Sequence, residues 1–356
     1  MIPNTRLMKI PAALLLLYLF SCEHPTEPKP DPGPDTTSHH FIWRVDTLGG
    51  IFSTAISIEI VSETEAYVGG EFFVYPNPND LSISERYNLA VWNGVKWTFE
   101  KVNFQINDQS KDFQQSPIKQ IRKIGESSLL FLSIGAECVF RKNGKDSYKN
   151  AKSPVNYCWA RSETDIYFTG YGGAFTHYDG VSFRSIPTGV TNDFVDIWGD
   201  EESVWITSDD KSSTAFAFGE YRNNNFRMVD NNPKGESRFP FGYISVYKPS
   251  IKSPLYLLIQ GFTLEVNSTA PLTYSTILNH VESGYYFYWV RGNAPNDLYL
   301  GDWNTQSFAH FNGKTWKTFT VNGEGQEAFT VRGNLIGGCG NNSNLIPPRV
   351  YMAKRF

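Results

Sequence analysis

Cysteine is scarce in this sequence, and the motifs of several common enzyme classes are missing. Four of the 356 residues are cysteines, and after Cys22 only Cys138, Cys158 and Cys339 remain. An odd number at wide spacing excludes a disulfide framework, and no Cys-x-x-Cys or clustered Cys/His spacing indicates zinc. We expect buried thiols, with one disulfide left open. The sequence has no Gly-rich phosphate loop, Gly-x-Ser-x-Gly elbow or His-Glu-x-x-His, so we expect neither a metal nor a cofactor.

The sequence has no excess of basic residues over acidic ones. Its one long apolar run lies near the N-terminus. Arg6 and Lys9 precede the segment IPAALLLLYLF, which is followed by Ser21 and Cys22. A positive segment, a short apolar core and a small residue are typical of an export signal, here residues 1–21, and the core is too short to span a bilayer. Removing Arg6 and Lys9 from the 32 Lys and Arg leaves 30 against 36 acidic residues. The mature chain is therefore mildly acidic and lacks the basic stripe that nucleic acid binding requires.

The end of this signal, Leu19-Phe20-Ser21-Cys22, resembles the lipobox of bacterial lipoproteins. The resemblance implies that Cys22 becomes the lipidated N-terminus; an ordinary signal peptide with an incidental Cys is the alternative. Residues 23–38 are rich in Pro, charged and small residues, which is typical of an extended tether. Because no polybasic or amphipathic segment is visible, membrane attachment would come from the lipid. We expect a membrane-anchored protein of the bacterial envelope, facing the periplasm or the cell surface, with a folded body over residues 39–356.

The body contains an internal repeat. Its first part is a polar turn residue followed by an apolar-aromatic-apolar triplet and usually Gly or Ser. The clear copies are EAYVGG at Glu65, DIYFTG at Asp165, SVWITS at Ser203 and DLYLGD at Asp297, and the weaker copies are SLLFLS at Ser128, PLYLLIQG at Pro254 and NLIGGCG at Asn334. Their mean spacing is about 45 residues, which is the length of one blade in a β-propeller.

A hairpin turn follows six of these copies. LAVWNGVKW (89–97), FTHYDGVSF (175–183) and FAHFNGKTW (308–316) share the turn and the aromatic positions around it. The other turns are Asn143-Gly144, the run Asn223-Asn224-Asn225 and Asn267-Ser268. Asn-Gly and Asp-Gly favour two-residue hairpins, in which both central residues need a positive φ. An inner apolar strand, the triplet strand and two hairpin strands per unit predict an all-β, seven-bladed β-propeller of four-stranded antiparallel blades.

The last unit ends in RVYMAKRF, where the other units have their turn. FIWRVDTL (41–48) resembles the strands that follow the turns, WTFEKV at Trp97 and WKTFTV at Trp316. We therefore predict that this N-terminal strand completes the last blade and closes the ring, which leaves no open sheet edge.

Several units resemble kelch-type blades, most clearly EAYVGGEF with the later YNLAVWNGVKW, where a Gly doublet follows the second strand and aromatic residues bracket the hairpin. The doublets are Gly69-Gly70, Gly172-Gly173 and Gly337-Gly338. GKTW also resembles the tail of the sialidase Asp box, but Ala309 and Phe311 stand where that motif has Ser and Asp. No catalytic residue is carried over from either family.

With strands A to D counted outward from the centre of the propeller, the B–C loops and D–A crossovers lie at one end of the propeller, and the A–B and C–D turns lie at the other. The longest connections, 71–88, 101–117 and 230–242, all belong to the first end, which we call the long-loop end. Long loops on a rigid scaffold usually carry binding. The expected contact residues are Tyr75, Arg86, Arg238, Phe239, Tyr243 and Trp303. Such side chains stack on sugars or anchor protein partners, whereas the local alternative is that each folds back on its own blade.

The same end carries several carboxylates. They are Asp80, Glu85, Asp108, Asp112, Asp209, Asp210 and Asp302. Two carboxylates about 5 to 10 Å apart would permit glycoside hydrolysis, and one beside a His would permit a lyase reaction. Solvated loop charges are the simpler interpretation. The pair Asp209-Asp210 lacks the Gly and the spaced oxygens of a calcium loop.

Two further sets of polar residues recur with the repeat. His177 and His310 occupy the hairpin position where the first unit has Val91, so we expect packed strand residues and not ligands. Arg122, Arg161, Arg291 and Arg332 recur at the A–B corner, and we interpret them as structural ion pairs with turn acids.

The sequence favours a monomeric, non-catalytic module that binds an envelope protein or a glycan. A polysaccharide-active hydrolase or lyase at the long-loop end is the second hypothesis. A purely structural role in an envelope assembly is the third.

Overall fold

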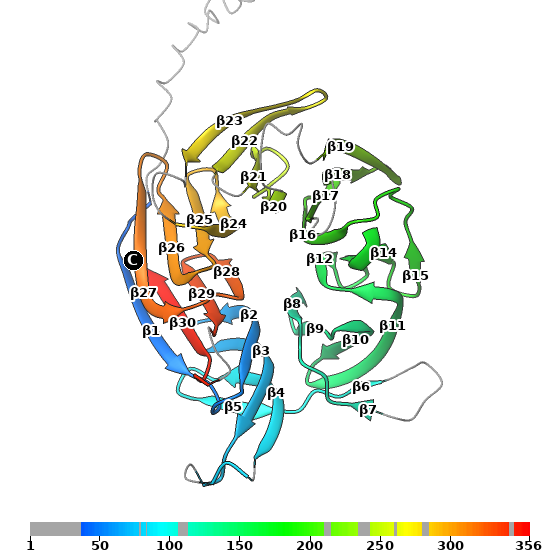
Figure 1. Ribbon diagram of the computed structural model, residues 1–356. Helices are drawn as coiled ribbons and strands as arrows, with labels where there is room; N and C mark the ends of the chain where they lie inside the picture. Colours follow the sequence, from blue (N-terminus) through cyan, green and yellow to red (C-terminus); the bar gives the residue numbers. More distant parts are fainter. Residues whose placement is uncertain are drawn as a thin grey trace, which may run out of the picture. The chain divides into compact units, whose positions relative to one another are not determined.

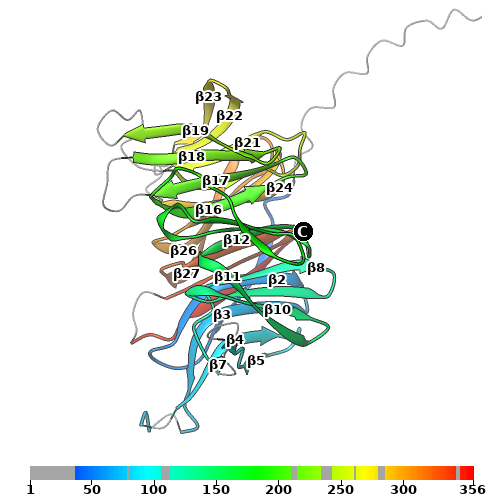
Figure 2. The same ribbon diagram turned by 90° about the vertical axis from the view of Figure 1, so that its right-hand side faces the viewer.

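The computed structural model describes residues 37–77, 80–82, 84–105, 113–209, 215–233, 243–259, 262–279, 285–341 and 345–356. These residues form seven four-stranded antiparallel sheets arranged in a ring (Figure 1). Seen edge-on, the strands run across the thickness of the ring (Figure 2). The predicted seven-bladed β-propeller is confirmed. Among the described residues no helix is long and apolar enough to cross a membrane.

The first four blades follow one another along the chain, with strand A nearest the centre of the ring. Blade 1 consists of β2 (Thr54–Ser62), β3 (Glu65–Val74), β4 (Glu85–Trp92) and β5 (Trp97–Glu100). Blade 2 consists of β8 (Gln120–Gly125), β9 (Ser128–Leu132), β10 (Gly135–Lys142) and β11 (Lys145–Val155). Blade 3 consists of β12 (Tyr157–Ser162), β13 (Asp165–Thr169), β14 (Phe175–Tyr178) and β15 (Phe183–Ser185). Blade 4 consists of β16 (Asp193–Gly199), β17 (Ser203–Asp209), β18 (Ala215–Arg222) and β19 (Asn225–Pro233).

The remaining blades complete the ring. Blade 5 consists of β20 (Tyr243–Tyr247), β21 (Leu255–Ile259), β22 (Phe262–Thr269) and β23 (Leu272–Asn279). Blade 6 consists of β24 (Phe287–Ala294), β25 (Asp297–Asp302), β26 (Thr305–Phe311) and β27 (Trp316–Glu324). Blade 7 consists of β28 (Ala328–Arg332), β29 (Leu335–Gly340), β30 (Arg349–Arg355) and β1 (Phe41–Thr47). A small hairpin, β6 (Phe104–Gln105) with β7 (Phe113–Gln114), and a short 3-10 turn, η2 (Tyr171–Gly173), lie in the connections.

Ring closure by the N-terminal strand is confirmed. β1 pairs antiparallel with β30 along its whole length, from Phe41 opposite Arg355 to Thr47 opposite Arg349. The Phe41 ring packs against Phe319, with ring centroids 4.8 Å apart. The first and last strands of the propeller are thereby held in one sheet, so β30 is not left as an open edge.

Each blade buries both of its faces against its two neighbours. In β3, Ala66 and Val68 join the core shared with blade 7, while Tyr67 points to the core shared with blade 2. The alternation follows from the two-residue period of a strand. It explains why β-branched and aromatic residues fill the inner strands, because both sides of the pleat are buried.

The three similar turns are longer than the sequence predicted. In blades 1, 3 and 6 the loop has four residues, and of the Asn-Gly or Asp-Gly pair only the Gly has a positive φ, +90° at Gly313 for example. The side chain of Asn312 accepts backbone N–H bonds from Lys314 and Thr315, at 3.1 and 2.9 Å. The Asn or Asp therefore builds the turn through its side-chain oxygen, and a positive φ is required of the Gly alone.

Two of the other predicted turns are correct and one is misplaced. Asn143-Gly144 and Asn223-Asn224 are two-residue turns with both residues at positive φ. In blade 5, β22 continues through Asn267-Ser268 to Thr269, and the turn to β23 lies at Ala270-Pro271. Proline has no N–H to donate and ends the ladder there.

The long connections contain more strand than predicted. Residues 71–74 and 85–88 extend β3 and β4, so the B–C connection of blade 1 is a protruding hairpin with a shorter tip. In the 101–117 crossover, Val102 and Phe104 are fully buried against blades 1 and 2. Of the 230–242 crossover, residues up to Pro233 belong to β19; 234–242 lie outside the described residues.

The four arginines of the inner strands form ion pairs, but most of them pair with acids of other inner strands and not, as the sequence predicted, with turn acids. Arg161 does pair with a turn acid, Asp165. Arg332 instead pairs at 2.8 Å with Glu59 on the inner strand of the next blade. Arg291 likewise pairs at 2.9 Å with Asp196 on an inner strand.

Arg122 follows the same pattern, because it lies 4.0 Å from Glu59. The ion pairs are structural, as expected. They mostly join strand to strand around the centre of the ring, where acids and arginines of different blades meet.

Candidate functional site

The long-loop end carries most of the exposed large apolar side chains among the described residues. Eight of these fifteen side chains lie in B–C loops or D–A crossovers. They are Phe52, Leu81, Ile134, Tyr171, Tyr286, Trp303, Leu345 and Ile346. The turns and the chain terminus at the other end expose Val95, Val181 and Phe356. A concentration of exposed apolar side chains at one end of a rigid scaffold is typical of an interaction surface.

Two of the predicted contact residues bond to neighbouring residues of the propeller. Tyr75 donates its hydroxyl to the backbone oxygen of Ile51 at 3.2 Å. Arg86 forms an ion pair with Glu71 at 2.5 Å. Tyr75 thus follows the local alternative, while Arg86 keeps a half-exposed side chain at the base of the protruding hairpin.

Trp303 lies in a small aromatic platform on blade 6. Its ring packs on Tyr288 with centroids 5.2 Å apart, and 44% of the residue is exposed. The backbone N–H of Trp303 donates to the oxygen of Tyr286, which is 50% exposed. Sequence reasoning missed Tyr286, because it begins the stretch YFYWVRG, which has the apolar character of an inner strand. Two half-exposed aromatic residues joined by a backbone hydrogen bond on one blade suit a sugar face or an apolar side chain.

Three predicted contact residues remain untested. Arg238 and Phe239 lie outside the described residues, and of Tyr243 the structure describes only the backbone at the start of β20. The contact set therefore stays a prediction.

The predicted carboxylates that the structure describes, Asp80, Glu85 and Asp302, are each bonded to residues close to them in the fold. Asp80 caps its turn by accepting the N–H of Ser82 at 3.0 Å, and Glu85 accepts the hydroxyl of Tyr87. Asp302 is buried, and burial raises its pKa, although the bonds that it accepts from Thr305 and from the N–H of Tyr286 oppose that shift. The remaining predicted acids, Asp108, Asp112 and Asp210, and the side chain of Asp209, lie outside the described residues. Asp80 and Asp302 thus act as loop caps and Glu85 is bonded to a neighbour on its own strand, so these three acids give the hydrolase hypothesis no support.

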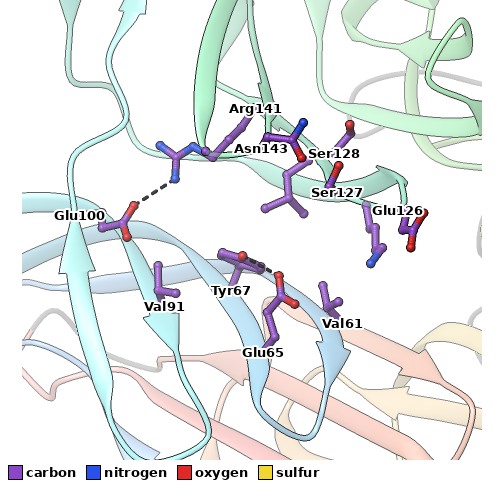
Figure 3. Close-up of a pocket in the computed structure, with 13 residues that line it drawn as sticks. Val61, Glu65, Tyr67, Val91, Glu100, Glu126, Ser127, Ser128, Arg141 and Asn143 are labelled. Carbon is purple, nitrogen blue, oxygen red and sulfur yellow. Dashed lines mark hydrogen bonds and ion pairs between the residues drawn. The ribbon is translucent and has the colours of Figure 1, made fainter.

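A cleft of about 530 Å³ lies at the opposite end, where blades 1 and 2 meet (Figure 3). Its walls are polar and carry both charges. Blade 1 contributes Val61, Glu65, Tyr67, Val91 and, at the end of β5, Glu100. Blade 2 contributes Lys123, Glu126, Ser127, Ser128, Leu129, Arg141, Asn143 and Gly144. The volume is in the range of clefts that hold small ligands or single side chains of a partner.

Two interactions organise the cleft walls, and both are drawn in Figure 3. Tyr67 donates its hydroxyl to Glu65 at 2.7 Å, and Arg141 donates to Glu100 at 2.9 Å. Burial, and then the bond to Glu65, raise the pKa of Tyr67, so its hydroxyl stays protonated and acts as a donor. Sequence reasoning missed this cleft because its walls come from two units of the repeat. The sequence does contain a signal for this end of the propeller. It is the residue that precedes each apolar-aromatic-apolar triplet, such as Glu65, because that residue lies at the A–B turn of its blade.

The two strand histidines are packed as predicted. His177 bonds to Asp165 at 2.7 Å and stacks on Tyr167, and His310 bonds to Asp297 at 3.0 Å. Burial lowers the pKa of His310, although Asp297 opposes that shift.

The three described cysteines are buried and free, as expected for apolar thiols. Their burial raises the pKa of each thiol. Within the described part of the chain, no group of three His, Cys, Asp or Glu side chains has the arrangement of a metal site.

No family model and no curated protein matches the chain. Among solved structures, YCF48 bound to a D1 peptide is 10% identical, with a TM-score of 0.61 over 90% of this chain and 97% of that chain. Virginiamycin B lyase from Staphylococcus aureus is 12% identical, with a TM-score of 0.62 over 89% and 100%. The extracellular domain of BT4673 from B. thetaiotaomicron is 9% identical, with a TM-score of 0.59 over 87% and 40%. At these identities the likeness shows the propeller fold and not an activity.

Proposed function

We propose that this chain is an exported, lipid-anchored propeller of the bacterial envelope that binds a protein or a glycan through its long-loop end and performs no chemistry. The observation that carries the proposal is the set of eight exposed apolar side chains at that end, with Tyr286 and Trp303 side by side on blade 6. The export signal, the lipobox-like sequence at Cys22 and the tether supply the proposed location.

The comparisons are consistent with a binding module without specifying its ligand. One propeller of this architecture is described with a bound peptide and another is a lyase. Because the fold hosts both, function has to be argued from the surface. Here Asp80 and Asp302 cap their own loops and Glu85 is bonded to Tyr87 on its own strand, which favours binding over hydrolysis.

The direct test is to cross-link the lipidated full-length protein in its own envelope, purify it, and analyse both protein and glycan. The binding partner found in this way is then titrated against purified variants. Trp303→Ala with Tyr286→Ala should weaken binding at least about tenfold, because exposed aromatic anchors dominate such interfaces. The melting temperature should change little, since both side chains are about half exposed.

The matched control replaces exposed apolar residues at the other end, Val95→Ser with Val181→Ser. This variant should bind like the unmodified protein. Equal loss of binding in both variants would show that the long-loop end is not the binding surface. Cleavage of a recovered glycan by the purified protein would overturn the non-catalytic assignment. The anchor is tested separately, because Cys22→Ser should release the protein from the membrane fraction.

A further inference from the structure

Three blades carry the same short motif at the turn end of strand B, an acid followed two residues later by a tyrosine. They are Glu65 and Tyr67 in blade 1, Asp165 and Tyr167 in blade 3, and Asp297 and Tyr299 in blade 6. In each copy the tyrosine points toward the next blade, because Tyr67, Tyr167 and Tyr299 all belong to the core on that side. The motif therefore lines the junction of two blades three times, and the copies can be compared with one another.

In blade 3 the chain itself supplies a cation to this motif. Arg161 forms an ion pair with Asp165, and its guanidinium lies 5.7 Å from the centre of the Tyr167 ring. His177, opposite Tyr167 on strand C, bonds to the same carboxylate. The acid is thus fully engaged, and Tyr167 is buried.

In blade 6 a different arginine reaches the same place. Arg355 at the end of β30 forms an ion pair with Asp297 and donates to the hydroxyl of Tyr299 at 2.6 Å. Its guanidinium lies 6.0 Å from the centre of the Tyr299 ring, and His310 also bonds to Asp297. Although burial opposes it, the bonds from His310 and Arg355 lower the pKa of Asp297 to about 2. Here again a guanidinium contacts both the acid and the tyrosine.

Blade 1 has the acid and the tyrosine, but shorter, uncharged side chains stand where blade 3 has its arginine and its histidine. Val61 is the residue that matches Arg161. In blade 1 Ser62 pairs with Glu65 across the A–B turn, and in blade 3 Ser162 pairs with Asp165 in the same way. Val61 and Arg161 each come directly before that serine. Opposite Tyr67, where the other copies have a histidine, stands Val91.

The position of Arg355 is occupied by Asn143 in blade 2. Each of the two residues comes directly after the last residue of strand C that pairs with strand B. The N–H of Arg355 donates to the backbone oxygen of Asn334, and the N–H of Asn143 donates to the equivalent oxygen of Ser127. Val61, Val91 and Asn143 are all shorter than the residues that they replace, and all three line the cleft of about 530 Å³. The cleft exists because the side chains that fill its counterparts are missing from this copy.

We propose that the cleft between blades 1 and 2 binds a guanidinium group from outside the chain, with Glu65 as its anion and Tyr67 as the ring beside it. The two filled copies show the arrangement that the ligand would complete. A guanidinium suits it better than an ammonium, because its planar fork can donate to a carboxylate and a neighbouring acceptor at once while its face lies against an aromatic ring.

The other charges of the cleft leave Glu65 available. Arg141 is held by Asp146 at 2.7 Å and by Glu100 at 2.9 Å, which fixes it on the far wall. Among the described ion pairs none involves Lys123 or Glu126, and none involves Glu65. Glu65 is half-buried and accepts one bond, from Tyr67. An additional cation would therefore neutralise a partly desolvated carboxylate, which strengthens the interaction relative to open solvent.

The test titrates the full-length protein with Nα-acetyl-L-arginine methylamide and with the matching citrulline derivative, which replaces the guanidinium by a neutral urea of the same shape. Saturation-transfer difference NMR at low ionic strength reports binding. The arginine compound should bind and the citrulline compound should not. Glu65→Gln should weaken the arginine compound about tenfold or more, because charged hydrogen bonds are the stronger ones. Glu63→Gln, on the same turn but paired with Lys354 at 2.7 Å, is the control and should bind normally.

Val61→Arg provides an independent variant, because it restores the cation that blade 3 supplies with Arg161. It should fill the cleft and abolish binding of the arginine compound, whereas Val61→Gln, of similar length without the charge, should reduce binding less. Equal binding of the citrulline compound, or unchanged binding by both Glu65→Gln and Val61→Arg, would overturn the proposal.

The source of the guanidinium is resolved by comparing free arginine with the peptide Gly-Gly-Arg-Gly-Gly. Preference for the peptide indicates an arginine side chain of a polypeptide partner, and preference for free arginine indicates an amino-acid ligand. Failure of both to bind would overturn the site. This outcome is independent of binding at the long-loop end, since the two surfaces lie at opposite ends of the blades.

Discussion

The ion pair between Arg291 and Asp196 should be one of the stabilising contacts of the ring. Two nitrogens of Arg291 meet the two oxygens of Asp196 at 2.9 and 3.1 Å, and both side chains are less than 10% exposed. Ser245 of blade 5 donates its hydroxyl to the same carboxylate at 2.6 Å. One carboxylate therefore joins the inner strands of blades 4, 5 and 6.

Asp196→Asn keeps the shape of the side chain but leaves the Arg291 charge buried without its anion. Removing one partner of a buried pair costs about 3 to 5 kcal/mol. We expect about 3 kcal/mol, because the amide oxygen of Asn can still accept the bond from Ser245. Arg291→Met should cost a similar amount. The double variant should be much less destabilised than the sum of the two, since no uncompensated charge remains.

The assay is urea unfolding at pH 7 followed by tryptophan fluorescence. Glu202→Gln is the control, because the pair of Glu202 with Arg222 is about half exposed and should contribute less than about 1 kcal/mol. If Asp196→Asn costs no more than this control, or if the two single effects simply add in the double variant, the reasoning about the buried pair is refuted.

Three further predictions concern other parts of the ring. The folded-state pKa of Asp297 is about 2, below the ordinary value, so about 2 kcal/mol of stability present above pH ~4 should be lost as the pH falls to ~2. Acid unfolding of Asp297→Asn should lack this component. Gly313→Ala, at a φ of +90°, should cost about 1 to 2 kcal/mol in urea unfolding. Phe41→Ala should cost about 2 to 3 kcal/mol and speed proteolysis within β1; normal resistance would contradict its role in closure.

Much of the fold could be predicted because the repeat is written in local chemistry. Apolar triplets at a regular spacing predict the strand B of each blade, and turn residues such as Gly313 mark the C–D hairpins. The closing strand was predictable as well, since FIWRVDTL resembles the outer strands. The errors came where several local solutions satisfy the same residues: the turn of blade 5 moved to Ala270-Pro271, and three Asn-Gly or Asp-Gly turns took four residues.

The candidate sites were less predictable, because they depend on which blades become neighbours. Tyr75 was expected to contact a ligand, and the sequence did not show that its hydroxyl also donates to the backbone of Ile51. The arginine ties were expected to reach turn acids, yet Arg332 reaches Glu59, which is far away in the sequence. Distances between units cannot be inferred from their spacing along the chain.

By itself, the sequence determined the seven-fold β repeat, its closure by the first strand and the end at which the loops gather, since these follow from strand periodicity and turn chemistry within single units. Tertiary structure alone decided that Glu65 and Tyr67 border an open cleft while Asp297 and Tyr299 are sealed by Arg355. The local sequence pattern determines which side chains, here the acid and the tyrosine, lie at the junction of a blade with the next one. In blade 6 that junction is filled by Arg355 from another blade, which packing brings into reach.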